Sequence, residues 1–290
     1  MNWNLCLWLL LPIALMGQID TDGVAEMLRA GDYDAAEELL LNRIENDKAP
    51  DLRSKLGEVY GYQGQWDKAI AVYRELTLTY PDDGDYLFRY GGVMAKKAQN
   101  SNIFIGLSLL GKIKSSFRRT IRLDPGHLGA HWALIDLYVS LPLIVGGSMS
   151  QAYHYAADLK KISKLDGYLA MGYVYEYDDK AGEAKSNYLK ALELLNEEQI
   201  IKRNQLHYQI GKICSEYNLE LERGIYHLGE YIDHYTVLDG VPLEWAYYRL
   251  AKIYRKKSEK ENAIKWINRS LELNPDLEQA ITEKKAIELL

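Results

Sequence analysis

The chain has 290 residues, of which 48% are hydrophobic and 26% are charged, a composition typical of folded globular proteins and not of disordered ones. Its formal net charge is -6 at pH 7, and it contains no long run of Lys or Arg. Binding to nucleic acid needs a basic surface, so neither DNA nor RNA is expected as a partner.

The first segment, MNWNLCLWLLLPIALMGQ, is apolar from Leu5 to Met16. A helix that spans a bilayer needs about 20 residues, so this stretch is too short to span and is typical of a secretory signal peptide over residues 1–17. Ala14 or Gly17 supplies the small residue that cleavage requires. We therefore expect a bacterial protein that is exported, periplasmic or secreted, with no membrane span after signal cleavage. An uncleaved anchor and a buried first helix are the alternatives.

Cysteine usage predicts a protein that is stabilised by packing alone. Cys6 lies inside the apolar stretch and not at a cleavage point, which argues against a lipoprotein. Cleavage would leave Cys214 as the remaining thiol, so no internal disulfide can form. Cys214 falls on the apolar face of a predicted helix, where a small buried hydrophobic residue is expected rather than a nucleophile.

The strongest pattern in the sequence is a repeat of about 34 residues. Its clearest copy is LGEVYGYQGQWDKAIAVYRELTLTYP, at residues 56–81. The signature residues of this copy are Leu56, Gly57 and Tyr60 on a first helix, Gly64 and Trp66 in the turn, Ala69 and Tyr73 on a second helix, and Pro81 at its close. The copy resembles the tetratricopeptide repeat (TPR) at nearly every signature position.

The pattern recurs about seven times between residues 19 and 275. Glycine inside a helix costs about 0.5–1 kcal/mol relative to alanine, so its recurrence at one position predicts that a second helix approaches too closely there for a side chain. These glycines are Gly57, Gly91, Gly172 and Gly211, and the matching second-helix alanines are Ala36, Ala69, Ala152, Ala184 and Ala263. The resemblance implies an all-α, right-handed superhelical α-solenoid over residues 18–275.

Residues 276–290 form one more amphipathic helix, with Leu277, Ile281 and Ile287 on its apolar side and many charges opposite. A solenoid repeat buries its apolar face only against its neighbours, so an open end needs a capping element with a polar outer side. This helix is the predicted C-terminal cap.

Two consecutive repeats exceed the standard length in the turn between their two helices, by about ten residues near 99–110 and about five near 140–148. Equivalent turns of consecutive repeats lie side by side, so these apolar insertions are expected to meet. The residues concerned are Ile103, Phe104 and Ile105 in the first and Leu141, Leu143, Ile144 and Val145 in the second. The leading interpretation is that two loops cover each other. The alternative is an exposed interaction edge formed by Ile103, Phe104, Leu143, Ile144 and Val145.

The second insertion, within LPLIVGGSMSQA at residues 141–152, has recognisable turn chemistry. Pro142 ends a helix, Gly146 and Gly147 permit left-handed backbone, and Ser148 or Ser150 can cap the next helix. This P-x3-GGS segment and the LDP junction before it resemble a subgroup of exported bacterial TPR proteins. That resemblance implies the repeat fold and export, and it implies no particular activity.

Motifs for catalysis or metal binding are absent from the sequence, including HExxH, a phosphate loop and GxSxG. His127 and His131 are one helical turn apart, but no third ligand is evident, and His227 and His234 are predicted on a solvated face. Acidic pairs such as residues 82–83 fall in turns, where they cap helices. We therefore predict no catalytic residue, no metal and no cofactor, and a protein that is not an enzyme.

In the family that the repeats resemble, regularly spaced positions of the first helices line a concave groove. The matching aromatic residues are Phe88, Trp132, Tyr173, Tyr208, Trp245 and Tyr248. The charged residues are Asp51, Glu58, Asp85 and Asp136 in early repeats and Lys212, Lys252 and Arg255 in late ones. Such a groove suits a partner peptide or helix, because aromatic side chains give contact area with little entropy lost. Alternatively, the aromatics only pack neighbouring helices and the lysines only solvate the surface.

Lys252 and Arg255, with Lys256 beside them, form a basic end of the predicted groove that is suited to a carboxylate. The asparagines of the family's peptide-carboxylate clamp are missing, so that specific clamp is not predicted. The sequence predicts a non-enzymatic protein-protein interaction or scaffold protein of the bacterial cell envelope. The alternative is a ligand-binding accessory component of a transport system with an aromatic-lined pore.

Overall fold

Periodic apolar residues and polar capping residues divide the chain into short helices. A computed structural model describes residues 22–195, 203–236 and 239–290, and every regular element within these ranges is a helix. Asp83 caps the helix that begins at Gly84 by accepting a hydrogen bond from the Tyr86 backbone N–H. No described helix combines the length and the apolar character that a bilayer span requires. The predicted signal peptide lies outside the described residues.

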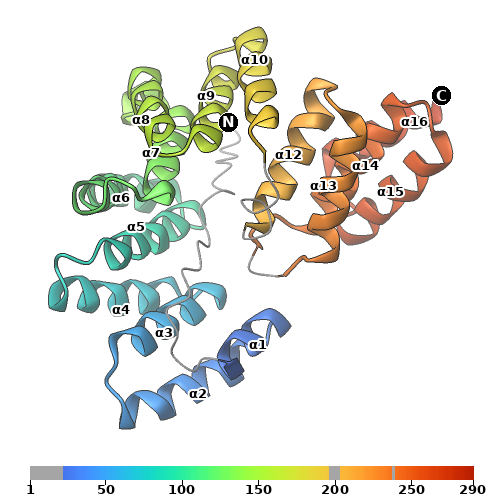
Figure 1. Cartoon of the computed structure of the whole chain (residues 1–290). Coiled ribbons are helices and arrows are strands. Elements are labelled where there is room, and N and C mark those ends of the chain that lie inside the picture. The colour runs from blue at the N-terminus through green and yellow to red at the C-terminus, as the bar shows by residue number, and fades with distance from the viewer. Residues whose placement is uncertain (1–21, 196–202, 237–238) are drawn as a thin grey trace. The chain divides into compact units, whose positions relative to one another are not determined.

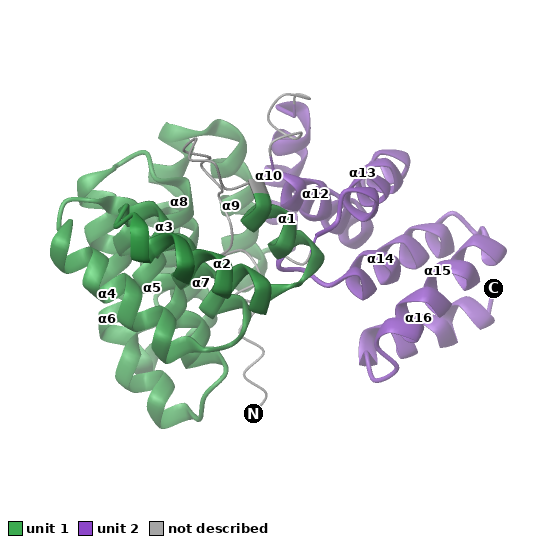
Figure 2. Cartoon of the chain, turned by 90° about the horizontal axis from the view of Figure 1, so that it is seen from below, with its two compact units in different colours: residues 1–180 green, residues 181–290 purple. Residues whose placement is uncertain are grey.

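The chain divides into two compact units, residues 1–180 and 181–290 (Figure 2). Figure 1 traces the helices in chain order. The first unit contains α1 (Asp22–Ala30), α2 (Tyr33–Asn46), α3 (Pro50–Tyr62), α4 (Trp66–Thr79), α5 (Gly84–Gln99), α6 (Ile103–Leu123), α7 (Leu128–Ser140), the 3-10 turn η1 (Leu143–Val145), α8 (Met149–Ile162) and α9 (Lys164–Tyr177). The second contains α10 (Ala181–Glu193), α12 (Asn204–Tyr217), α13 (Leu221–Asp233), α14 (Leu243–Lys256), α15 (Lys260–Leu273) and α16 (Glu278–Glu288).

Consecutive helices pack as pairs within each unit. In the first unit these pairs are α1 with α2, α3 with α4, α5 with α6, and α7 with α8; in the second they are α12 with α13 and α14 with α15. First helices of neighbouring pairs also contact each other, namely α7 with α9, α12 with α14, and α14 with α16. This arrangement confirms the predicted all-α fold of helix-turn-helix repeats.

The repeat glycines lie where the two helices of a pair come closest. A Cβ atom on Gly57 would lie 2.8 Å from a ring carbon of Tyr73, and one on Gly91 would lie 2.8 Å from a ring carbon of Phe117. Either side chain would have to displace a buried aromatic ring, so glycine is required for this packing. The matching alanines are also fully buried: Ala36, Ala69, Ala152, Ala184 and Ala263. The predicted close approach of the paired helices is confirmed.

Helix α16 covers the apolar face of the last pair, as expected for a C-terminal cap. Leu277 and Ile287 are buried in a cluster with Ala263 and Ile267 of α15. Ile281, which the sequence places on the same apolar side, is instead exposed. The cap therefore uses a narrower apolar face than its sequence indicates.

The first insertion extends a helix, so the expectation of a loop there is wrong. Helix α6 has 21 residues, whereas the second helices α4 and α8 have 14 each. The Asn102 side chain caps α6 by accepting hydrogen bonds from the backbone N–H groups of Phe104 and Ile105, each at 3.1 Å. The second insertion does form a turn, η1, which Gly146 ends with a left-handed φ of 90°.

Candidate functional site

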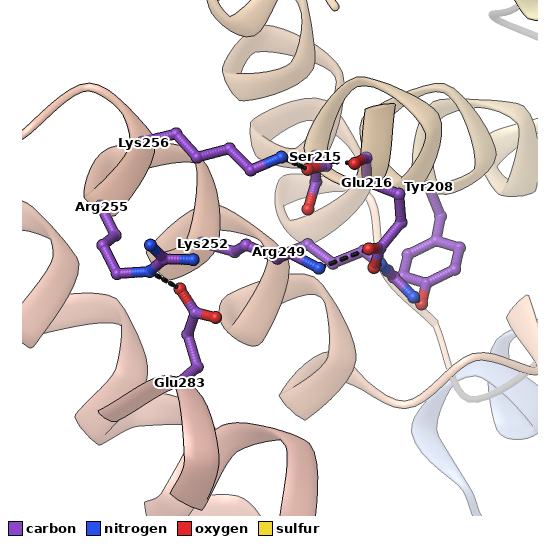
Figure 3. Close-up of polar contacts among 8 residues, drawn as sticks. All are labelled: Tyr208, Ser215, Glu216, Arg249, Lys252, Arg255, Lys256 and Glu283. Atoms are coloured by element: carbon purple, nitrogen blue, oxygen red, sulfur yellow. Dashed lines mark hydrogen bonds and ion pairs between the residues drawn. The ribbon is translucent and has the colours of Figure 1, made fainter. Parts of the chain in front are cut away.

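The first helices of the second unit share a cluster of charged side chains (Figure 3). Arg249 of α14 is only 7% exposed, and its Nε donates a hydrogen bond to the Tyr208 hydroxyl of α12 at 3.0 Å. Glu216 of α12 forms ion pairs with both Arg249 and Lys252 of α14. A buried guanidinium is tolerated only when it is paired, so these contacts hold α14 against α12.

The two cations control the ionisation of Glu216. Burial alone would raise the pKa of this carboxyl, but Arg249 and Lys252 outweigh burial and lower its pKa to about 2. Glu216 is therefore ionised at neutral pH and compensates part of the positive charge around it.

Two further contacts extend the cluster along α14. Arg255 forms an ion pair with Glu283 of α16, whose side chain is buried. The Lys256 ammonium donates to the backbone carbonyl oxygens of Ser215 at 2.6 Å and Glu216 at 3.3 Å. Both carbonyls belong to the last turn of α12, where a cation interacts favourably with the helix dipole.

We call this set of residues the basic cluster: Arg249, Lys252, Arg255 and Lys256, with Glu216 and Glu283. Four cations face two carboxylates, so the cluster keeps a positive excess after its internal ion pairs are counted. Lys252 and Arg255 were predicted to be available to a partner's carboxylate, and the structure shows that each already contacts a carboxylate of this chain. Lys212, also predicted in the groove, lies half-buried on α12.

The aromatic residues of the predicted groove divide between the units, and most of them hold helices together. In the first unit Phe88, Trp132 and Tyr173 are buried. Trp132 of α7 donates its indole N–H to Asp166 of α9 at 3.0 Å, and the Tyr173 hydroxyl donates to Asp136 at 2.5 Å. Burial and the nearby Asp136 raise the pKa of Tyr173. These contacts match the alternative in which the aromatics pack neighbouring first helices.

In the second unit Tyr248 is buried, whereas Tyr208 and Trp245 are half-buried. The buried rings lend no support to an aromatic-lined pore. Of the predicted groove aromatics, Tyr208 and Trp245 are the two that are partly exposed and therefore partly accessible to a partner.

The acidic residues of the predicted groove lie on first helices of the first unit. The Asp51 carboxylate accepts a hydrogen bond from the Tyr86 hydroxyl at 3.2 Å, and Asp85 pairs with the His127 ring at 3.2 Å. The third acidic residue, Glu58, pairs with Lys55 at 2.9 Å and Arg89 at 3.7 Å. Hydrogen bonding to His127 lowers the pKa of Asp85 despite partial burial. Each of these carboxylates thus has a partner within the unit.

The two apolar insertions do not cover each other. Phe104 is 79% exposed, Leu143 is 82% exposed and Ile144 is 93% exposed. Ile103 and Ile105 are also exposed, Val145 is half-buried, and Leu141 alone of the set is buried. The interpretation as a satellite core is therefore wrong, because the apolar side chains of the two insertions remain exposed instead of burying one another.

One histidine, His227, is buried where the sequence predicted a solvated face. His227 is 3% exposed, and its Nδ1 lies 3.0 Å from Nδ1 of the buried His207. No described group of three or more His, Cys, Asp or Glu side chains is arranged to hold a metal. Cys214 is buried, as predicted, and burial raises the pKa of its thiol to about 12.

Sequence reasoning missed Arg249, Glu216 and Glu283, which carry the basic cluster. Arg249 follows the predicted groove residue Tyr248 by one position, so the spacing rule passed over it. Its partner Glu216 lies one repeat earlier, 33 residues away. A search for opposite charges about one repeat apart on first helices is the signal that could have found the pair.

Comparisons with known proteins agree with this architecture. Residues 53–83 and 244–277 each match a tetratricopeptide repeat family model. A solved tetratricopeptide repeat protein from Parabacteroides merdae ATCC 43184 has a TM-score of 0.53 and 14% identity, covering 92% of this chain and 97% of that chain. The Pseudomonas aeruginosa protein pilF has a TM-score of 0.50 and 13% identity, covering 82% of this chain and 98% of that one.

A chain of the APC/C hetero-tetramer Cut9-Hcn1 has a TM-score of 0.57 and 15% identity. That alignment covers 91% of this chain but 48% of the relative, so this chain spans about half of the relative's length. No curated protein sequence matches the chain. At these identities the structures show the fold alone. The two matched segments are similar to tetratricopeptide repeats, a fold that generally mediates protein-protein interaction or scaffolding.

Proposed function

We propose that this protein is a non-enzymatic interaction or scaffold protein of the bacterial cell envelope, and that its second unit binds a partner peptide or helix at the basic cluster. The observation that supports this most directly is the positive excess of that cluster, four cations against two carboxylates. An acidic segment would complete the charge balance and approach the half-buried Tyr208 and Trp245.

The envelope location is proposed from the sequence of residues 1–17. That segment has the apolar core and the small residues of a secretory signal, and its removal would leave a chain that begins at Gln18. The mature protein would be periplasmic or secreted. Immunodetection in periplasmic and cytoplasmic fractions, combined with N-terminal sequencing, tests this placement; full-length protein in the cytoplasmic fraction would contradict it.

The binding proposal is tested by capture from a native envelope extract with the chain from Gln18 onward, followed by affinity measurement with the captured partner. Lys252→Gln removes one cluster cation while Arg249 still pairs with Glu216, so the fold should persist. We expect about a tenfold weaker affinity, typical of one charged contact at an interface.

Lys265→Gln on α15 is the matched control, because it removes the same charge from an exposed position outside the cluster. If the two variants bind the partner with equal affinity and melt at equal temperatures, the basic cluster is not the partner site. If Lys265→Gln binds as the wild type does and Lys252→Gln binds more weakly, the basic cluster is supported as the partner site.

A further inference from the structure

The two insertions present an exposed apolar edge at one end of the first unit. We call it the insertion edge, and it consists of Ile103, Phe104, Ile105, Leu143 and Ile144. Helix α6 is seven residues longer than α4 and α8, a difference of about 10 Å along its axis. Exposed apolar side chains that are grouped in this way usually mark a site of interaction.

Contacts between α6 and the η1 turn link the two parts of the insertion edge. Helices α6 and α7 pack against each other and are joined by a short turn, so the start of α6 and the end of α7 lie at the same end of the pair. The Lys114 ammonium of α6 donates to the Gly146 carbonyl at 2.5 Å and lies 5.0 Å from the centre of the Tyr138 ring. These contacts hold the η1 turn against α6.

The charges on α6 differ from those elsewhere in the molecule. The helix has five cations and no carboxylate: Lys112, Lys114, Arg118, Arg119 and Arg122. Within the described residues, none of the five forms an ion pair. Lys114 and Arg119 donate to backbone carbonyls, and Arg118 donates to the Tyr138 hydroxyl. Lys112 and Arg122 are exposed. No carboxylate within the described residues offsets the positive charge of α6, and its exposed Lys112 is available to a negatively charged surface outside the chain.

We propose that the insertion edge docks the protein on an anionic phospholipid surface, with Phe104 and Ile144 among the acyl chains and Lys112 and Lys114 at the headgroups. Interfacial protein segments bury apolar side chains about 5–10 Å below the headgroups. Lys112 follows Phe104 by eight residues, about 12 Å along the helix, so its ammonium reaches headgroup level when Phe104 is inserted.

The exposed apolar helix end and the exposed Lys112, which has no carboxylate partner within the described residues, favour lipid over a folded protein partner. A protruding apolar tip can enter a fluid layer directly, whereas a protein partner must provide a matching pocket. Cations near an apolar anchor strengthen its attachment to anionic membranes, and Lys112 and Lys114 are the two α6 cations nearest to the insertion edge. This proposal concerns the first unit and does not depend on partner binding at the basic cluster.

Co-sedimentation with vesicles tests the proposal, using the chain from Gln18 onward, which contains every described residue. The vesicles are phosphatidylcholine alone, or phosphatidylcholine and phosphatidylglycerol in equal parts. We expect binding to the anionic vesicles to exceed binding to the neutral ones at least tenfold and to weaken with added salt. Lys112→Gln should weaken it about fivefold.

The double variant Phe104→Ser/Ile144→Ser should lose binding at least tenfold while keeping its melting temperature, since both side chains are exposed. Leu78→Ser is the matched control, because Leu78 is an exposed apolar residue on α4, outside the edge, and this variant should bind as the wild type does. Equal binding by the double variant and the control would overturn the proposal. The lipid proposal would also be overturned if the wild type and the control self-associate in sedimentation velocity and the double variant does not. That result would assign the insertion edge to contact with a second copy of the chain.

Discussion

The basic cluster of the second unit and helix α6 of the first unit both carry several cations, but their surroundings differ. In the basic cluster Arg249, Lys252 and Arg255 contact carboxylates of neighbouring first helices, and one of these cations is almost fully buried. The cations of α6 contact carbonyl or hydroxyl oxygens or remain exposed. Carboxylates across the helix interface offset part of the basic cluster's charge and hold the repeats together, whereas the cations of α6 have no carboxylate partner within the described residues.

The largest effect that would test this contrast is expected from Glu216→Gln. This change keeps an amide oxygen that can accept a hydrogen bond, but it removes the negative charge that compensates the buried Arg249 and Lys252. Breaking a buried ion pair costs about 3–5 kcal/mol, and because the Glu216 side chain is 31% exposed we expect about 2–3 kcal/mol less stability in the second unit. Urea denaturation followed by circular dichroism measures this loss.

Glu222→Gln provides the control for that experiment. The Glu222 carboxylate pairs with Lys257, but its side chain is 79% exposed, so its loss should cost less than about 0.5 kcal/mol. Similar losses in the two variants would mean that the basic cluster contributes no more than a surface ion pair.

A pH-dependent loss of stability is expected next, at the histidine pair of the second unit. Burial and then His207 lower the pKa of His227 to about 4, below the unfolded value of about 6.5. A depressed histidine pKa means that the unfolded state binds more protons, so the stability is present above pH 6.5 and is lost as the pH falls toward 4. At pH 5 the loss should be about 2 kcal/mol, measured by urea denaturation at pH 7 and pH 5.

The charged groups around this pair are Glu230 and His234 near His207, and Arg223 near His227. Replacing both buried histidines by glutamine should remove most of the loss between pH 7 and pH 5. Replacing the exposed His154 should leave it unchanged. A pH dependence that survives the double replacement would assign the effect to other groups.

Two glycines of the α5 and α6 pair should respond to alanine in opposite directions. Gly91→Ala would push a Cβ against the buried ring of Phe117, and we expect a loss of about 1–2 kcal/mol. A Cβ on Gly111, in the exposed part of α6, would meet nothing within 4 Å, so Gly111→Ala should stabilise the helix by about 0.5–1 kcal/mol. Thermal denaturation of both variants checks the signs; a stabilised Gly91→Ala would contradict the close packing of the pair.

The smallest effect on stability is expected at the insertion edge itself. Phe104→Ser and Ile144→Ser each remove an exposed side chain, so the free energy of unfolding should change by less than about 0.5 kcal/mol. A larger loss in urea denaturation would show that these residues support the fold. If these variants lose vesicle binding but not stability, the insertion edge serves binding, whereas the ion pairs of the basic cluster also stabilise the fold.

The repeat fold could be predicted from the sequence because its signals are local. The close contact of Gly57 with Tyr73 follows from a glycine and an aromatic residue at fixed positions within one repeat. The helical start of the first insertion also had a local signal, since Asn102 precedes an apolar helical pattern and caps it. Counting residues between repeats detected the insertion but did not indicate its conformation, because an insertion of given length can extend a helix or form a loop.

The sequence by itself determined the all-α repeat architecture, the glycine and alanine contacts within pairs, and the C-terminal helix. Only the tertiary structure decided that Arg249 pairs with Glu216, that His227 faces His207, and that Phe104 remains exposed. The physical reason is the distance along the sequence between the residues that make each contact. Helix pairing inside one repeat depends on residues a few turns apart, whereas ion pairs, buried polar contacts and exposure depend on which side chains neighbouring repeats bring together.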